Sequence, residues 1–301
     1  MAIAKRIFLF LAINFLVVLM ISIILQLLNV QPFLTNYGLD YQSLLIFCLV
    51  WGFAGSFISL ALSRVMAKNL MKVQIIDPVQ SDNEHYKIYQ MVERLAQKAH
   101  LKAIPEVGIY RSNEVNAFAT GPTQNRSLVA VSTGLLNKLK TSEIEAILAH
   151  EITHISNGDM VTMTLMQGVV NAFVMFLARV VAYAVSSLNR SKNSSRSNYF
   201  SYYMFVYLFE VAFMVLGSMV TATYSRFREF RADKGGAELS SKEDMIGALR
   251  SLKVMQEIKD PKASPPSMQA FKISSPPKKR LIHLFATHPP LDVRIERLQN
   301  M

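Results

Sequence analysis

The chain of 301 residues contains almost no cysteine, and charge is missing from long stretches of it. The single cysteine, Cys48, excludes an intramolecular disulfide and lies inside an apolar run, so cysteine usage does not decide the compartment. The apolar fraction of 51% and the mean hydropathy of +0.25 are high for a soluble protein. Because the apolar residues collect in a few long runs, the composition indicates a membrane protein rather than a soluble one with a rich core.

Two of these runs carry no charge. Ile7 to Leu28 covers about 22 residues and Leu44 to Leu62 is also of spanning length, enough for a hydrocarbon core of roughly 30 Å. Lys5 and Arg6 before the first run also fit a signal peptide. The run exceeds the roughly 7–15-residue apolar core of such peptides, and no clear small-x-small cleavage site follows. We therefore expect a retained helix.

Basic residues lie beside the apolar runs. A net charge of +11 would by itself suggest nucleic acid or an anionic surface. Here lipid headgroups are the better partner, and we expect no nucleic acid. The loop Asn29 to Ser43 has no Lys or Arg, whereas the second run is followed directly by Arg64, Lys68 and Lys72. The positive-inside rule then places the N-terminus and everything after the second run in the cytoplasm.

Two further apolar stretches, Val161 to Leu188 and Tyr202 to Tyr224, carry one charge each, Arg179 and Glu210. We expect them to span the membrane; the alternative is a hairpin against the protein or the interface, because the link between them is basic. In an antiparallel hairpin both charges lie about 12–14 Å from the turn, at 1.5 Å per residue. Charges at that depth are costly unless they pair, and the alternative is that each side chain reaches an interface separately.

The rest of the chain has the patterns of a globular α+β domain. The expected elements are helices over Tyr86–Lys98, Thr141–Asn157, Ser240–Ile258 and Leu291–Leu298, a strand over Leu128–Ser132 and a Pro/Ser/Lys-rich loop over Lys259–Arg280. Two capping boxes mark helix starts, Ser142 with Glu145 and Ser240 with Glu243. Gly158 supplies the stop of the second helix.

That second helix carries His150-Glu151-Ile152-Thr153-His154, an H-E-x-x-H sequence. A spacing of four puts both imidazoles on one helical face, where they can reach one tetrahedral metal. Glu151 can then take a proton from a metal-bound water. The alternative is a surface helix with two incidental histidines. The capped helix, the preceding strand and the small or apolar residues of the opposite face argue against it.

A catalytic zinc ion needs a third protein ligand, and no third histidine follows closely, which excludes the metzincin spacing. Glu229 is the strongest candidate. Asp233, four residues further on the same helical face, is well placed to hydrogen-bond a ligating imidazole. On spacing alone, a solvated Arg–Glu–Arg face is the alternative.

Four patterns occur in one order: Asn116-Ala117-Phe118-Ala119-Thr120-Gly121, the H-E-x-x-H followed by Asn157-Gly158-Asp159, Glu229-Phe230-Arg231-Ala232-Asp233, and Thr287-His288-Pro289-Pro290. Together they closely resemble the HtpX family of bacterial membrane metalloproteases, relatives of the type I CAAX prenyl proteases, over nearly the whole chain. The resemblance implies one zinc ion held by His150, His154 and Glu229, with Glu151 catalytic. It also implies an inner-membrane protein whose active site faces the cytoplasm and which clears damaged membrane proteins under stress. The basic link between the third and fourth runs fits the simple four-span picture poorly.

Two further segments have expected roles. Val115 to Ala119 resembles the family's edge strand, and its residues Asn116, Ala117, Phe118 and Ala119 would receive a substrate backbone as an added strand. The alternative is a plain structural strand, and Thr120-Gly121-Pro122 is expected to end it as a turn. His288, extended before a proline, or Arg294 would donate to the oxyanion formed during hydrolysis. The alternative is that they anchor the C-terminal helix.

The sequence thus predicts a mainly α membrane protein with a small α+β zincin-type catalytic domain and four apolar helices. Its parts are residues 1–63 with two transmembrane helices, 64–159 with the H-E-x-x-H helix, 160–224 with the third and fourth apolar helices, and 225–301 with the third ligand. The predicted function is zinc-dependent hydrolysis of protein substrates. One alternative is a zinc-containing membrane protein that holds clients without cutting them, which the intact Glu151 disfavours. A channel or transporter is disfavoured by the uncharged first two spans and the large soluble segments.

Overall fold

The computed structural model describes residues 34–35, 38–79, 82–188, 195–257 and 284–301. The predicted first span, Ile7 to Leu28, and the predicted loop, Lys259 to Arg280, lie outside these residues. The chain divides into two compact units. One comprises the chain up to Ser59 and Thr164–Ser218, and the other comprises Leu60–Met163 and Met219–Met301. The predicted domain boundaries after residues 63, 159 and 224 stay predictions.

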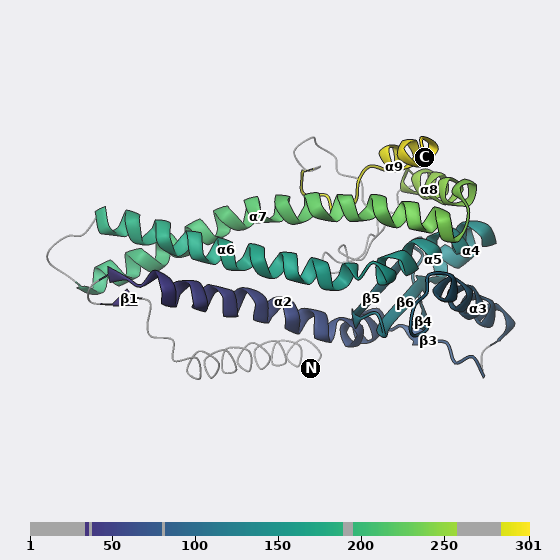
Figure 1. Ribbon diagram of the computed structural model, residues 1–301, viewed down its shortest axis with the longest axis horizontal. Helices are drawn as coiled ribbons and strands as arrows, with labels where there is room; N and C mark the ends of the chain where they lie inside the picture. Colours follow the sequence, from purple (N-terminus) through teal and green to yellow (C-terminus); the bar gives the residue numbers. More distant parts are fainter. Residues whose placement is uncertain (1–33, 36–37, 80–81, 189–194, 258–283) are drawn as a thin grey trace. The chain divides into compact units, whose positions relative to one another are not determined.

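Three long helices carry the described apolar runs: α2 (Tyr41–Met71), α6 (Asp159–Leu188) and α7 (Ser195–Leu239) (Figure 1). By length and composition, each has a stretch able to cross a membrane, with mean hydropathies of 2.2, 1.9 and 1.9. A fourth span is not seen in the part of the chain that the structure describes. Helix α7 continues past Tyr224 without a break, because no proline or glycine interrupts it before Gly235. The predicted third ligand therefore lies on the same helix as the last apolar run.

In the first unit, helices α6 and α7 are joined by a half-buried ion pair. Arg179 Nη1 donates to Glu210 Oε1 at 2.5 Å and to Met175 O at 3.0 Å. The Arg179 guanidinium also lies 5.4 Å from the centre of the Phe47 ring on α2. The predicted pairing of the two charges is confirmed, and separate side chains reaching an interface are not observed for these two residues. Before α2, Leu34–Thr35 (β1) and Gly38–Leu39 (β2) form a two-stranded hairpin.

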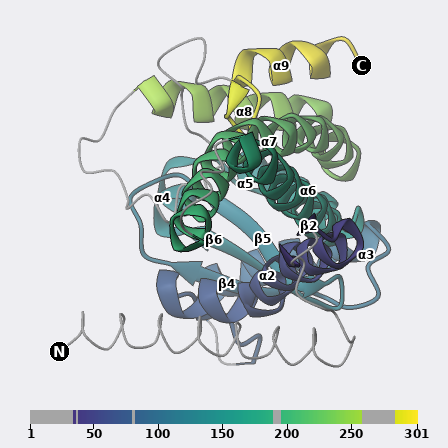
Figure 2. The same ribbon diagram turned by 90° about the vertical axis from the view of Figure 1, so that its left-hand side faces the viewer.

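The second unit contains a four-stranded sheet in the order β3-β4-β6-β5, and β4, β6 and β5 lie side by side in Figure 2. The strands are β3 (Gln74–Ile75), β4 (Glu106–Tyr110), β5 (Ala117–Thr123) and β6 (Arg126–Ser132). Strands β4 and β6 are parallel, and the other two pairs are antiparallel. Strand β6 is buried from Ser127 to Ser132, which explains its nearly continuous apolar run.

Strand β5 lies at an edge of this sheet. The predicted turn at Thr120-Gly121-Pro122 is wrong, because the strand continues through it to Thr123. The pairing of β5 with β6 shifts in register between Thr120 and Thr123. Within this shift, Gly121 has a φ of 143°, a backbone conformation that favours glycine. The strand therefore bends without ending.

In the described part of the second unit there are five shorter helices: α3 (Asn83–Lys98), α4 (Thr133–Lys138), α5 (Thr141–Ser156), α8 (Lys242–Glu257) and α9 (Leu291–Gln299). Helix α5 is central, since every residue from Ala146 to Ile155 is buried. It packs against α3, α8 and strand β5. The predicted mainly α fold is confirmed for the described residues, and their α+β part contains a small mixed sheet.

The helix starts differ from the two predicted capping boxes. At α5 the Lys140 N–H donates to Glu143 Oε2 at 3.0 Å, while Glu145 instead pairs with Arg94 at 2.7 Å. The extended residue before the helix is Lys140, so the box forms there rather than at Ser142. At α8, Ser241 Oγ accepts from the Asp244 N–H at 3.0 Å. The cap therefore lies one residue after the predicted Ser240, and the predicted box is wrong.

Candidate metal centre

Helix α5 and helix α7 bring three metal-ligating side chains together. His150, His154 and Glu229 are all buried, and Glu229 has no exposed surface. His150 Nε2 and His154 Nε2 lie 3.1 Å apart, as expected for residues one helical turn apart. Each Nε2 is 3.4 Å from a carboxylate oxygen of Glu229. The predicted third ligand candidate therefore faces the two histidines.

These separations fit a tetrahedral ion. Zinc–nitrogen and zinc–oxygen bonds of about 2.0–2.1 Å place neighbouring ligand atoms about 3.3 Å apart. The three observed separations, 3.1, 3.4 and 3.4 Å, agree with that value. Among the described residues, these three side chains form the group close enough to share one metal ion.

Carboxylates behind the two imidazoles favour the same arrangement. His150 Nδ1 lies 3.1 Å from Asp233 Oδ1, and His154 Nδ1 lies 2.7 Å from Asp159 Oδ2. With a proton on each Nδ1, both Nε2 atoms present lone pairs to one another and to Glu229. Three electron-pair donors converge there, so the pocket requires a cation, which can be a metal ion or added protons.

The electrostatics of the metal-free site agree with this requirement. Burial opposes a charge on His150, but Asp233 and Glu229 outweigh it and raise the pKa of His150 to about 9. The pKa of His154 is also raised against burial, by Glu229 and Asp159. Without a metal, protons take the place of the cation; with a metal, those protons must leave.

Arg294 enters the site from helix α9. Its Nε donates to Asp233 Oδ2 at 2.8 Å and its Nη2 donates to Asp233 Oδ1 at 2.5 Å. Burial disfavours its charge, but Asp233 raises the pKa of Arg294 above its ordinary value. The Arg294 side chain has no exposed surface, and its Nη1 lies 3.8 Å from Glu229 Oε2. This environment favours the predicted alternative, in which Arg294 anchors the C-terminal helix.

His288 has a different position. Its Nδ1 lies 2.8 Å from Glu229 Oε2, and 22% of its side chain is exposed. His288 therefore contacts the Glu229 carboxylate with a buried nitrogen while the rest of its side chain is partly exposed, whereas Arg294 is enclosed.

Glu151 lies beside the edge strand. The Ala119 N–H donates to Glu151 Oε2 at 2.8 Å. Of the other predicted strand residues, Asn116 precedes β5 and its side-chain amide donates to the Tyr110 hydroxyl, and Phe118 is buried against Tyr110. Ala117 is buried as well. Ala119 is thus the predicted strand residue that the structure brings to Glu151.

Two residues around the site had no role assigned from the sequence. Asp159 is the partner of His154, and Arg231 Nη2 donates to Asp159 Oδ1 at 3.2 Å. The sequence feature that could have indicated Asp159 is its position directly after Gly158. The φ of 67° at Gly158 turns the chain at the end of helix α5. An acidic residue just beyond such a turn can fold back onto a histidine in the last helical turn.

Comparisons with known proteins agree with these observations. Residues 82–301 match the family described as Peptidase family M48. The chain is 46% identical over 299 residues to "Protease HtpX homolog" of Methylacidiphilum infernorum, covering 99% of both chains. It is 46% identical over 305 residues to the protein of the same name from Bacillus subtilis, covering 98% of this chain and 99% of the relative. The predicted resemblance is confirmed.

A solved structure shares the fold. The crystal structure of S. mikatae Ste24p superposes with a TM-score of 0.65 at 18% identity, over 98% of this chain. This chain spans 64% of the length of that one. From the family match, the full-length relatives and the three apolar helices, we conclude that the chain belongs to peptidase family M48 and is a membrane metalloprotease.

Proposed function

We propose that this chain is a zinc-dependent endopeptidase that hydrolyses peptide bonds in misfolded or damaged membrane proteins. The single observation that carries the proposal is the convergence of His150, His154 and Glu229 beside Glu151 and the edge of β5. We further propose one zinc ion per chain, held by those three side chains. The fit of the ligand separations to zinc–ligand bond lengths supports this choice.

The residues of the site divide the work of hydrolysis. A bound zinc ion would supply an activated water and polarise the scissile carbonyl. Glu151 accepts the proton of the attacking water and delivers it to the leaving amine. His288, which is partly exposed, donates to the oxygen of the scissile carbonyl. Arg294 is a positioning residue that holds Asp233, and Asp233 and Asp159 orient the two imidazoles.

The substrate binds as an extended strand along the outer edge of β5. Among the described strands, β5 pairs only with β6, so no other described strand of the sheet occupies its second edge. The contact from the Ala119 N–H to Glu151 places that edge next to the proposed base. A strand added there would bring its backbone carbonyls past the metal centre.

The sequence and the relatives support the location and the role that we propose. The basic residues after the second apolar run support an active site on the cytoplasmic side of the bacterial inner membrane. The name "Protease HtpX homolog" carried by the relatives supports proteolysis, and the apolar helices support substrates in or near the membrane. Removal of damaged membrane proteins under stress is the role we propose.

The test is cleavage of an unstable membrane protein by the purified, zinc-loaded chain. Glu151→Gln should bind zinc and lose cleavage by at least about a hundredfold, as expected for removal of a general base. Glu145→Gln on the same helix, which only loses its pair with Arg94, should cut normally. If wild type cuts none of several substrates while zinc is bound, the client-holding alternative takes precedence.

A further inference from the structure

The metal centre lies very near the ends of two apolar runs. On helix α7 the run ends at Tyr224, and Glu229 follows about 7.5 Å further along the axis at 1.5 Å per residue. On helix α6 Asp159 is the first residue, and the apolar run begins at Val161, about 3 Å away. Residues Met160 to Met163 and Met219 to Glu229 belong to the same compact unit as the metal centre. The ligand Glu229 and the His154 partner Asp159 therefore both lie within about 7.5 Å of the end of an apolar run.

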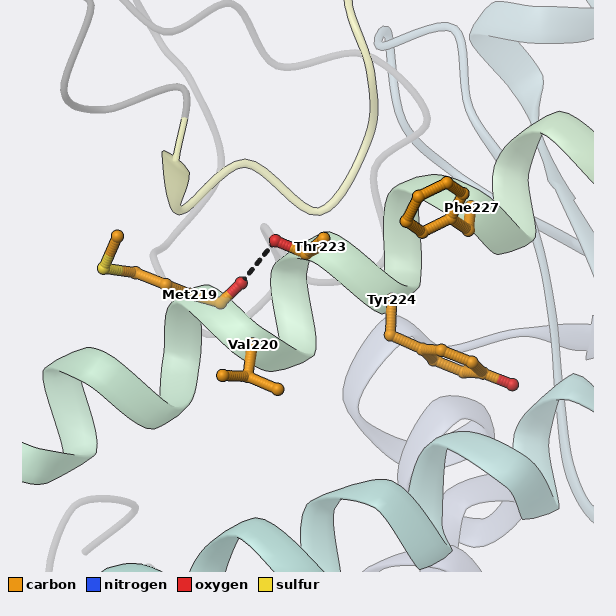
Figure 3. Close-up of a pocket in the computed structure, with 5 residues that line it drawn as sticks. All are labelled: Met219, Val220, Thr223, Tyr224 and Phe227. Carbon is orange, nitrogen blue, oxygen red and sulfur yellow. Dashed lines mark hydrogen bonds between the residues drawn. The ribbon is translucent and has the colours of Figure 1, made fainter.

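Side chains around the end of the α7 run have the character of a membrane–water boundary. A shallow apolar pocket there is lined by Met219, Val220, Thr223, Tyr224 and Phe227. Figure 3 shows Met219, Thr223 and Phe227 on one side of α7 and Val220 and Tyr224 on the other. Phe227 is an apolar residue that is 62% exposed, and it directly follows a charged residue, Arg226. A tyrosine at the end of an apolar run with an arginine two residues later, as with Tyr224 and Arg226, is typical of the headgroup layer.

The thickness of a bilayer shows in which layer the metal centre lies. A hydrocarbon core of about 30 Å within a total of about 40–45 Å leaves a headgroup layer of roughly 5–7 Å on each side. The distances of about 3 and 7.5 Å along α6 and α7 put the metal centre inside this layer or at its outer limit. A soluble protease domain on a flexible tether would have no such constraint.

We propose that the metal centre works within the headgroup layer and cuts the extended chain that directly flanks a transmembrane helix of the substrate. The inference rests on the proposed function and specifies its substrate class. An extended chain spans about 3.3 Å per residue, so the nearest bond in reach lies roughly two or three residues beyond the last apolar residue. Adding the seven residues of β5 gives a far limit of about ten.

Bonds further along a flexible tail reach the centre less often. The effective concentration of a tethered site falls roughly as the −3/2 power of the tether length. A bond 40 residues from the membrane should then be cut about 20-fold less often than one at five residues. Cleavage position should consequently follow distance from the membrane rather than local sequence.

The first test uses the full-length, zinc-loaded protein in liposomes. Its substrate has one transmembrane helix followed by a long tail of one repeated short sequence, so that sequence preference cannot select a site. Mass spectrometry should find the cuts within about ten residues of the last apolar residue. An even distribution of cuts along the tail overturns the inference. If nothing is cut, and unfolded soluble proteins are not cut either, the proposed function itself fails.

The second test measures how deep residue 227 lies in the bilayer, and it does not depend on proteolytic activity. In a Trp51→Phe background, which removes the one natural tryptophan, Phe227→Trp should be quenched by lipids brominated near the start of the acyl chain. Val254→Trp on α8, at a position that is 57% exposed, is the matched control and should not be quenched. An unquenched Trp at residue 227, or equal quenching at both positions, contradicts the inference.

Discussion

The buried pair of Arg294 and Asp233 allows a quantitative prediction for Arg294→Met. Methionine keeps much of the length of the side chain but removes the two hydrogen bonds, of 2.8 and 2.5 Å, that Asp233 accepts. The side chains are 0% and 3% exposed, so water cannot replace the lost donors. Removing one partner of such a pair costs about 3–5 kcal/mol, because the other charge stays buried.

Lys253→Met is the matched control. Lys253 also reaches helix α9, where it pairs with Asp292, but its side chain is 42% exposed and that of Asp292 is 70% exposed. An exposed pair contributes about 0–1 kcal/mol. The comparison separates the effect of burial from the general effect of losing a cation near the C-terminus.

The assay is reversible urea unfolding in detergent micelles, in the presence of a chelator so that bound metal does not add to the stability. Arg294→Met should lower the free energy of unfolding by about 3–5 kcal/mol and the melting temperature by roughly 10 °C. Lys253→Met should change the free energy by less than about 1 kcal/mol. Equal losses in the two variants would refute the reasoning, since the buried Asp233 charge would then have to be balanced without Arg294.

Three further predictions concern the metal site and the apolar helices. Asp159→Asn, which weakens the partner of His154, should lower zinc affinity about 10–100-fold in a chelator competition, and an unchanged affinity would show that Asp159 does not orient the ring. Because the pKa of His150 is raised to about 9 in the metal-free protein, zinc must displace a proton below that pH; apparent affinity should rise about tenfold per pH unit for each proton released, and a flat profile would contradict this sign. Arg179→Met should lower the melting temperature by leaving the Glu210 carboxylate without its cation, and adding Glu210→Gln should restore part of the loss; no recovery would mean that packing rather than charge is responsible.

Features set by local spacing could be predicted from the sequence. The four-residue spacing of His150 and His154 places two imidazoles on one face in any regular helix, so their proximity needed no tertiary information. The second apolar run, Leu44 to Leu62, lies within α2 for a similar reason, since an uncharged stretch of that length favours a helix. The similar depths of Arg179 and Glu210 follow from the helical rise and the antiparallel connection alone.

Features set by distant contacts could not be predicted in this way. Arg294 and Asp233 are separated by 61 positions, and only the packing of α9 brings them together. Spacing alone left Glu229 with a solvated alternative, which its complete burial against both histidines removes. At the edge strand, the sequence pattern could not reveal that Phe118 packs against Tyr110 or that the backbone N–H of Ala119 donates to Glu151.

The most direct test of the account is zinc binding by the Glu229→Gln variant, measured by equilibrium dialysis with metal analysis. Glu238→Gln on the same helix is the matched control, because that carboxylate is exposed and pairs only weakly with Lys234 at 3.8 Å. We predict one zinc ion per chain in wild type and in Glu238→Gln, and a loss of most of the affinity in Glu229→Gln. Undiminished binding of one zinc ion by Glu229→Gln would contradict the proposed ligand set and the catalytic geometry built on it.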